Sequence, residues 1–262
     1  MDGIVVAVLA NADYFVLLLF RMAALVISSP LFGRVGVPQL VKTAFTLALT
    51  VLFFITFPPV EEIVYSTLIG FALIVVSEVM IGIALGFVTN MFFSLAFTAG
   101  QLIDMQIGFG IVNIYDQQNN TQIPMVGNLY NIILLLSFFG VNAHHKLFAM
   151  IRTTLTRLPV GNAVFSPNIG SVALELFAKA FLMGVMVALP VIASGLILEI
   201  TLGVLIRSVP QMNMFVVGIP IKIAIGFVLL IVCIPMLVNY SNVIFDELFL
   251  GVERMFATFI AL

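Results

Sequence analysis

Long apolar runs dominate this chain, and short polar segments separate them. The runs predicted to form helices cover residues 4–29, 41–57, 63–99, 123–140, 172–206, 214–240 and, in a shorter tail, 243–262. A helix needs about 20 mostly apolar residues to cross a bilayer, so 63–99 and 172–206 are too long for one perpendicular span. Each must be tilted, broken, or covered by protein outside the membrane. Pro190 and Pro235 lie inside apolar runs and are expected to kink or break their helices.

The composition places these runs in a membrane. Hydrophobic residues make up 63% of the 262 positions and charged residues only 8%, whereas soluble domains are about 45–50% apolar and about 25% charged. The predicted fold is therefore an all-α polytopic membrane protein of about 6–8 long, partly broken helices in a single domain over 1–262. The run at 4–29 follows Asp2 rather than the basic region of a secretory signal, so we expect it to be a retained membrane helix.

The sequence carries no pattern typical of an enzyme. It contains no P-loop, nucleophile elbow, HExxH or glycine-rich dinucleotide motif, and its one cysteine, Cys233, excludes an intramolecular disulfide. His144 and His145 are neighbours and point about 100° apart on a helix, so a polar helix end is favoured over a metal site. The basic residues form no patch interleaved with aromatics, so nucleic acid is not an expected partner. We expect no catalytic residue, no cofactor and no metal.

Ionisable side chains inside apolar runs are candidates for function, because charges are costly in lipid. Buried charges are expected at Glu78, Glu175, Lys179 and Glu199. Glu175 and Lys179 are four positions apart and share a helix face, which favours a structural ion pair. Glu78 has no partner nearby in the sequence, so it is expected to contact another subunit or to line a water-filled path. Gly82 and Gly86 form a GxxxG motif, which allows close approach of a helix from the same chain or from a neighbouring subunit.

One segment between two apolar runs differs from both. Residues 108–124 read GFGIVNIYDQQNNTQIP, with two glycines, an apolar piece at 111–115 and a polar run at 116–121. Irregular backbone at membrane depth is tolerated where protein buries it or where it lines an aqueous cavity, and glycines permit sharp bends. A pore-lining or pore-filling loop is slightly favoured over an ordinary exposed loop, because an exposed loop has no need of the apolar piece.

Several stretches resemble the FliR family, the R-type subunits of the export gate in bacterial flagellar type III secretion. They are RMAALVISSPLFGRVGVPQLVK (21–42), GQLIDMQIGFG (100–110), ALPVIA (188–193) and IRSVPQMNMFVVGIPIKI (206–223). The most specific block consists of Arg207, Pro210, Gln211, Met212, Asn213, Phe215, Gly218, Pro220 and Lys222. The resemblance covers nearly the whole chain. One departure is GVNA (140–143), where a turn richer in glycine or acid is expected.

The resemblance implies a place in a multi-subunit gate. One R-type chain is expected to join about five P-type and about four Q-type subunits in a helical assembly in the bacterial inner membrane, at the flagellar basal body. Unfolded export substrates would pass through its central pore. Membrane lipid and a cytoplasmic substrate-switching subunit are further expected partners. The residues expected to support subunit assembly are Arg207, Pro210, Gln211, Lys222, Gly82 and Gly86.

The resemblance also implies a role for the unusual segment. By position, the loop that fills the closed pore is 106–122. Its expected plug residues are Gln106, Gly108, Phe109, Gly110, Ile111, Val112, Asn113, Ile114, Tyr115, Asp116, Gln117, Gln118, Asn119 and Asn120. Two other functions stay open: the equivalent subunit of a virulence injectisome, and a stand-alone small-solute or ion transporter in which Glu78 and Glu199 would carry ions or protons.

Overall fold

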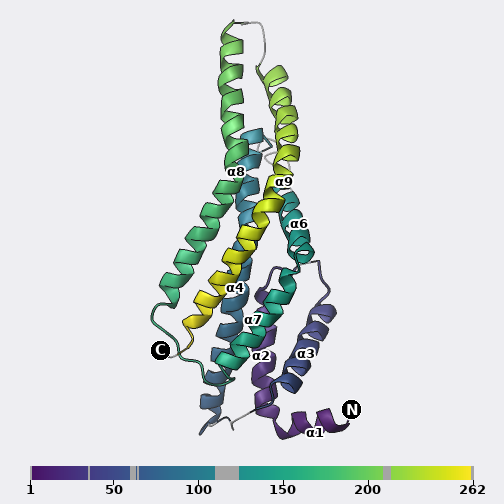
Figure 1. The fold of residues 1–262 in the computed structure, drawn as a ribbon, viewed down its shortest axis with the longest axis vertical. Helices are drawn as coiled ribbons and strands as arrows, with labels where there is room; N and C mark the ends of the chain where they lie inside the picture. The colour runs from purple at the N-terminus through teal and green to yellow at the C-terminus, as the bar shows by residue number, and fades with distance from the viewer. Residues whose placement is uncertain are drawn as a thin grey trace. The chain divides into compact units, whose positions relative to one another are not determined.

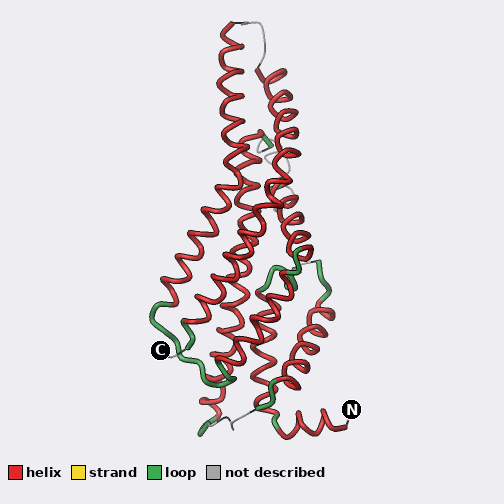
Figure 2. Tube along the Cα trace, in the orientation of Figure 1, coloured by secondary structure: helices red, strands yellow, loops and turns green. Residues whose placement is uncertain are grey.

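The computed structural model describes residues 2–34, 36–59, 63, 65–109, 124–208 and 214–260. Within these residues every regular element is a helix (Figure 1), and Figure 2 shows helices joined by loops, with no strand in the same ranges. In chain order the helices are α1 (Asp2–Ala10), α2 (Ala12–Ser28), α3 (Gln39–Thr56), α4 (Leu68–Ile107), α6 (Met125–Gly140), α7 (Ala143–Arg157), α8 (Ile169–Ser208) and α9 (Met214–Ala257). The predicted all-α fold is confirmed.

Among the described residues, four helices are long and apolar enough to cross a membrane, namely α3, α4, α8 and α9. The bent pair α6 and α7 adds a fifth if the two count as one broken span. In each of the four, 28% or less of the apolar window is buried inside the chain, so lipid or other subunits must cover the rest. With 40 residues, α4 is about 60 Å long, roughly twice the hydrocarbon thickness of a bilayer. The helix therefore exceeds a perpendicular span, as its sequence predicts.

The chain divides into two compact units, which are described separately. Unit 1 comprises 1–91, 142–176 and 247–262, and unit 2 comprises 92–141 and 177–246. The helices α4, α8 and α9 each contribute residues to both units. These three helices run through both units. The single domain expected from the sequence stays a prediction.

In unit 1, α2 packs against both α3 and α4. Phe15 of α2 meets Phe54 of α3 edge to face, with 5.6 Å between the ring centroids. A Cβ added to Gly82 would lie 2.7 Å from the Cβ of Ala24, and one added to Gly86 would lie 2.8 Å from the Cβ of Ser28. The GxxxG motif therefore lets α4 approach α2 of the same chain. That contact fills this face, which leaves no room there for the neighbouring subunit that the sequence also allowed.

In unit 2, α8 and α9 run side by side in opposite directions (Figure 1). The rings of Phe93, Phe138 and Phe245 join α4, α6 and α9, with centroid separations of 5.5 Å for Phe93–Phe138 and 5.2 Å for Phe138–Phe245. A Cβ added to Gly184 of α8 would lie 3.0 Å from the carbonyl oxygen of Leu95. All four helices of the unit thus pack through aromatic rings or through a close approach at glycine.

The apolar run predicted as one helix at 4–29 forms two. Asn11 separates α1 from α2 and has a non-helical backbone, with φ −127° and ψ 44°. Its side-chain amide donates to the carbonyl oxygen of Ala7 at 3.1 Å. Asparagine side chains compete in this way with the hydrogen bonds of the helix backbone, which explains why the helix ends here despite its apolar neighbours.

The basic segment around Lys146, Arg152 and Arg157 lies outside the helical runs predicted from the sequence, yet it forms a helix, α7. Its buried positions include Leu147, Ile151 and Leu155, which recur every four residues and form one apolar stripe. That periodicity was the signal for an amphipathic helix.

The turn before α7 explains the departure from the expected family pattern. Asn142 adopts the left-handed conformation, with φ 56° and ψ 28°. After glycine, asparagine is among the residues that best tolerate this conformation. GVNA therefore makes, with asparagine, the turn for which a stretch richer in glycine or acid was expected.

Prolines do not interrupt the long helices. Pro190 lies inside α8, and Pro220 and Pro235 lie inside α9. The separate tail helix expected at 243–262 is instead the last part of α9, which ends at Ala257. A break in lipid would leave several backbone groups without partners, whereas a proline inside a continuous helix removes one hydrogen bond. Of the kink or break expected at Pro190 and Pro235, the break is therefore absent.

The contact between α4 and α2 makes a direct prediction. Gly82→Ala places a methyl group against the Arg21 backbone, which cannot rotate away, so overpacking of about 1–3 kcal/mol should exceed the gain of about 1 kcal/mol in helix propensity. Gly70→Ala is the control in the same helix, since its Cβ would lie 3.5 Å from its nearest neighbour. Thermal unfolding followed by circular dichroism at 222 nm should give a lower midpoint for Gly82→Ala only. Equal midpoints would contradict the close packing.

Candidate functional site

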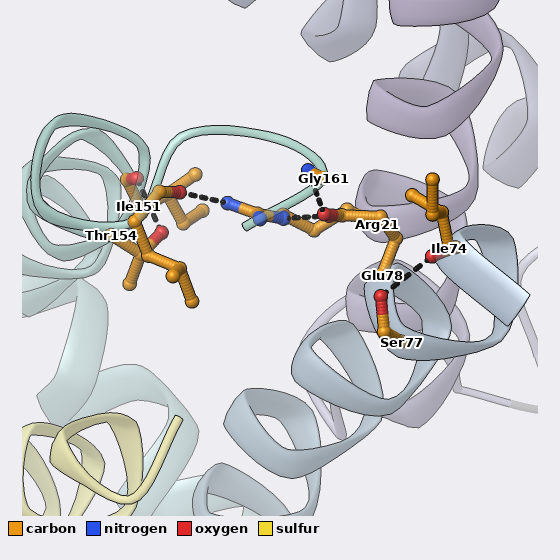
Figure 3. A network of polar contacts seen from close by, with 8 residues as sticks. Arg21, Ile74, Ser77, Glu78, Ile151, Thr154 and Gly161 are labelled. Carbon is orange, nitrogen blue, oxygen red and sulfur yellow. Dashed lines mark hydrogen bonds and ion pairs between the residues drawn. The ribbon is translucent and has the colours of Figure 1, made fainter. Parts of the chain in front are cut away.

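Unit 1 contains a buried ion pair (Figure 3). Arg21 of α2 and Glu78 of α4 are both 0% exposed. The Nε of Arg21 donates to Oε2 of Glu78, and its Nη1 donates to the carbonyl oxygen of Leu158 at 3.2 Å. The backbone N–H of Gly161 donates to Oε1 of Glu78 at 2.8 Å. The pair thus ties α2, α4 and the turn after α7 together.

This arrangement gives Glu78 a partner that the sequence did not reveal. The expectation of an inter-subunit contact or a water-filled path rested on the lack of a nearby base, but Arg21 lies 57 positions away in the chain. Both residues stand alone in apolar runs, and such isolated charges of opposite sign are natural partners in lipid. Glu78 is therefore engaged inside the chain and does not face an aqueous path in unit 1.

Much of the predicted plug lies outside the described residues. The plug residues not described are Gly110, Ile111, Val112, Asn113, Ile114, Tyr115, Asp116, Gln117, Gln118, Asn119 and Asn120, and the same holds for Pro210 and Gln211 of the assembly block. Gln106, Gly108 and Phe109 are placed, at the end of α4. The structure thus describes the base of the segment, where it leaves α4 and where it joins α6.

Asp104 holds both sides of this base. Its carbonyl oxygen accepts hydrogen bonds from the N–H of Gly108 at 3.1 Å and of Phe109 at 2.9 Å. Its buried carboxylate accepts from the N–H of Val126, in the first turn of α6, at 3.3 Å. A carboxylate is favourable at this end of a helix, because the unpaired N–H groups and the helix dipole attract negative charge. Asp104 therefore contacts the chain both just after the end of α4 and in the first turn of α6.

Two glycines complete the base. A Cβ on Gly100 would lie 2.9 Å from the carbonyl carbon of Val126, so the backbones of α4 and α6 approach closely there. Gly108 has φ +100°, a conformation that residues with a side chain rarely adopt. Gly100 and Asp104 are four positions apart and therefore share a face of α4. Three residues of GQLID and GFG thus have distinct roles: Gly100 permits the close approach of α6, Asp104 caps α6, and Gly108 makes the turn after α4.

A polar cluster lies beside this base. Lys222 of α9 forms an ion pair with Glu199 of α8, and the Nε2 of Gln106 donates to the same carboxylate oxygen at 3.4 Å. The side chain of Lys222 is 19% exposed and that of Glu199 is 42% exposed. From the sequence, Gln106, Lys222 and Glu199 are expected in separate roles, in the plug, in assembly and as a buried charge. The structure brings them together, and Glu199 is only partly buried within the chain.

The remaining predicted charges lie towards the chain surface. Glu175 pairs with Arg254 at 2.9 Å, and its side chain is 57% exposed, so it is not the buried charge that the sequence suggested. Lys179 is half-buried. Arg207 is exposed in the last turn of α8. An exposed pair such as Glu175–Arg254 contributes at most about 1 kcal/mol to stability.

Known proteins resemble this chain over most of its length, including most of the residues described above. The family described as bacterial export proteins, family 1, matches residues 12–248. The flagellar biosynthetic protein FliR of Bacillus subtilis (strain 168) is 35% identical, over 85% of this chain and 86% of its own length. FliR of Escherichia coli (strain K12) is 30% identical over 88% of both chains, and FliR of Aquifex aeolicus (strain VF5) is 28% identical over 92% of both.

The buried pair makes a second prediction. Glu78→Gln leaves the Arg21 guanidinium buried without its counter-charge, which should lower the free energy of unfolding by about 3–5 kcal/mol. Glu175→Gln, which removes an exposed pair, should change it by about 1 kcal/mol or less. Denaturant unfolding in detergent micelles measures both. The double variant Arg21→Met, Glu78→Leu should recover most of the loss, and a double variant no more stable than Glu78→Gln would contradict this account.

Proposed function

The chain belongs to the FliR family, family 1 of the bacterial export proteins, and on this premise we propose that it is a non-enzymatic subunit of the flagellar protein export gate. It resides in the bacterial inner membrane at the flagellar basal body. There it forms part of the pore through which unfolded flagellar proteins leave the cytoplasm. Its segment 106–122 plugs that pore when the gate is closed.

The observation that carries the plug is the base formed by Asp104. Because the carbonyl group of this residue holds the chain after α4 and its carboxylate caps α6, the intervening segment starts and ends at one fixed point. A loop whose two ends are fixed in this way can fill a pore with the residues between them. The polar run at 116–121 suits a wet lumen, where its weak hydrogen bonds are easily exchanged for those of an arriving substrate.

The exposed apolar surface supports membership of an assembly. The spans of this chain bury 28% or less of their apolar windows, and α4 exceeds the thickness of a bilayer. Apolar helix beyond the membrane must be covered by protein. The P-type and Q-type subunits, about five and about four in number, provide that cover in a helical arrangement. A cytoplasmic substrate-switching subunit is a further partner of the assembled gate.

The two other functions are supported less well. A stand-alone ion transporter would use Glu78 and Glu199, yet Glu78 is enclosed with Arg21 and Glu199 holds Lys222. The injectisome alternative predicts the same architecture. The relatives reported above are flagellar biosynthetic proteins by name, which favours the flagellar system.

The subunit role predicts a defined complex. The chain, affinity-purified after co-expression with the P-type and Q-type proteins of its own organism, should appear in native mass spectrometry as one copy within a single heavy assembly. Expression without those proteins should give no such species and no transport activity in liposomes. A monomer or homodimer that ignores both partners, or solute transport by the chain alone, would contradict the proposal.

The plug predicts a leak. Removal of 111–120 should raise ion flux through the assembled gate in proteoliposomes by about tenfold or more, because it empties the constriction that blocks the pore. Gates carrying Glu175→Gln, prepared in the same way, serve as the control and should stay tight. Membranes that hold the deleted gate and are as tight as those with the control would show that this segment is not the plug.

A further inference from the structure

We propose that Gln106, Ile107 and Phe109 form a fixed anchor, which stays seated between α8 and α9 both when the gate is closed and when it exports. This inference rests on the proposed function, because it concerns how the base of the plug segment behaves during export. It assigns positioning roles to Gly195, Glu199, Lys222 and Gly226.

The surface of α8 and α9 that holds this anchor is called the seat, and two glycines, Gly195 and Gly226, form its centre. A Cβ on Gly195 of α8 would lie 2.7 Å from the Cγ of Gln106, and a Cβ on Gly226 of α9 would lie 2.7 Å from the Cγ2 of Ile107. Neither position has room for a single methyl group. The side chains of two successive residues at the end of α4 therefore fit against two different helices, and Ile107 is fully enclosed there.

An aromatic contact extends the seat by two residues. The ring of Phe109 meets that of Phe227 in α9 edge to face, with centroids 5.6 Å apart and an angle of 70° between the planes. Such pairs contribute beyond the area that they bury. Gly108 makes the turn that allows it, since its positive φ carries the chain out of the helix.

The ion pair closes the polar side of the seat. Lys222 and Glu199 join α9 to α8, and Glu199 also accepts the hydrogen bond of Gln106. Opposite charges attract more strongly beside low-dielectric surroundings than in water. The pair thus holds the two helices at the spacing that the side chains of Gln106 and Ile107 require.

These contacts favour an anchor over a moving element. Release of the α4 end would break the glycine packing on two helices, the ring contact and the hydrogen bond to Glu199 together, and would also disturb the cap that Asp104 provides to α6. Tightly packed contacts of this kind are either made or lost as a set. The least costly opening leaves all of them in place.

Engineered disulfides test whether the seat must open. In a Cys233→Ser background, one gate carries Gln106→Cys with Gly195→Cys, and a second carries Ile107→Cys with Gly226→Cys. Replacing Gln106 or Ile107 by cysteine removes the side-chain atoms that a Cβ at position 195 or 226 would meet. Because the nearest of those atoms is bonded to the Cβ of Gln106 or Ile107, the two Cβ atoms of each pair lie near the separation of about 3.5–4.5 Å typical of disulfides. Loss of labelling by a polyethylene-glycol maleimide confirms that the bond has formed.

An anchor predicts that each oxidised gate secretes a flagellar substrate without loss relative to the same gate after reduction. Export that stops on oxidation and recovers on reduction would overturn the proposal, because the end of α4 would then have to leave its seat. Two pairs are used so that a variant that fails to assemble does not decide the result. Single-cysteine variants control for oxidation itself.

A second arm tests whether the seat holds the segment in place. Gly226→Leu fills the space of Ile107 and should make the assembled gate leak ions, as removal of 111–120 does. Gly203→Leu in α8 is the matched control and should stay tight, because nothing lies within 4 Å of its Cβ position. Glu199→Gln removes the ion pair with little change in shape and should leak less than Gly226→Leu.

If Gly226→Leu and Glu199→Gln both stay tight while the deletion leaks, the anchor is wrong and the plug stands. If the deletion itself does not leak, the plug fails, and the disulfides still report whether the seat opens.

Discussion

A polar group that leaves water in this chain must find its partner within the protein, and that constraint shapes both units. In lipid, an unpaired backbone or charged group costs several kcal/mol. Arg21 and Glu78 pair with each other and also hydrogen-bond to the backbone of Leu158 and Gly161. In unit 2 the carboxylate of Asp104 accepts a hydrogen bond from a backbone N–H in the first turn of α6. In each unit a charged side chain thus decides where segments distant in sequence come together.

Close approach at glycine is the second means of joining helices. Apolar side chains gain little by leaving lipid for one another, so tight packing has to replace the hydrophobic effect as the source of helix association. Gly82 serves this purpose between α4 and α2, Gly100 between α4 and α6, and Gly226 between α9 and the end of α4. All three contacts involve α4, which contributes to the cores of both units. The helix that precedes the segment 106–122 is therefore also one of the helices that contribute to both units.

The sequence predicts the class of fold well and the partners of its charges poorly. Apolar runs identify α3, α4, α8 and most of α9, because length and hydropathy are local properties. Asn11 and α7 were missed for a different reason: one polar side chain ends a helix, and an amphipathic stripe was hidden among bases. The pair of Arg21 with Glu78 could not be derived from spacing, since 57 positions separate them. The GQLID stretch around Asp104 is visible in the sequence, but only the packed helices reveal that its carboxylate caps α6.

The use of charge also distinguishes a gate subunit from a transporter. A carrier needs an acid that can exchange its proton or ion with water, and so one that is not committed to a permanent base. Glu78 is enclosed with a guanidinium that donates to it directly, and Glu199 is shared between Lys222 and Gln106. Both acids that a transporter would require are thus engaged in holding helices together. In the gate that we propose, the path instead forms between chains, and this chain supplies part of its wall together with the segment 106–122. In that proposal, Asp104 fixes both ends of the segment, and the packing of the α4 end against α8 and α9 lies directly beside it.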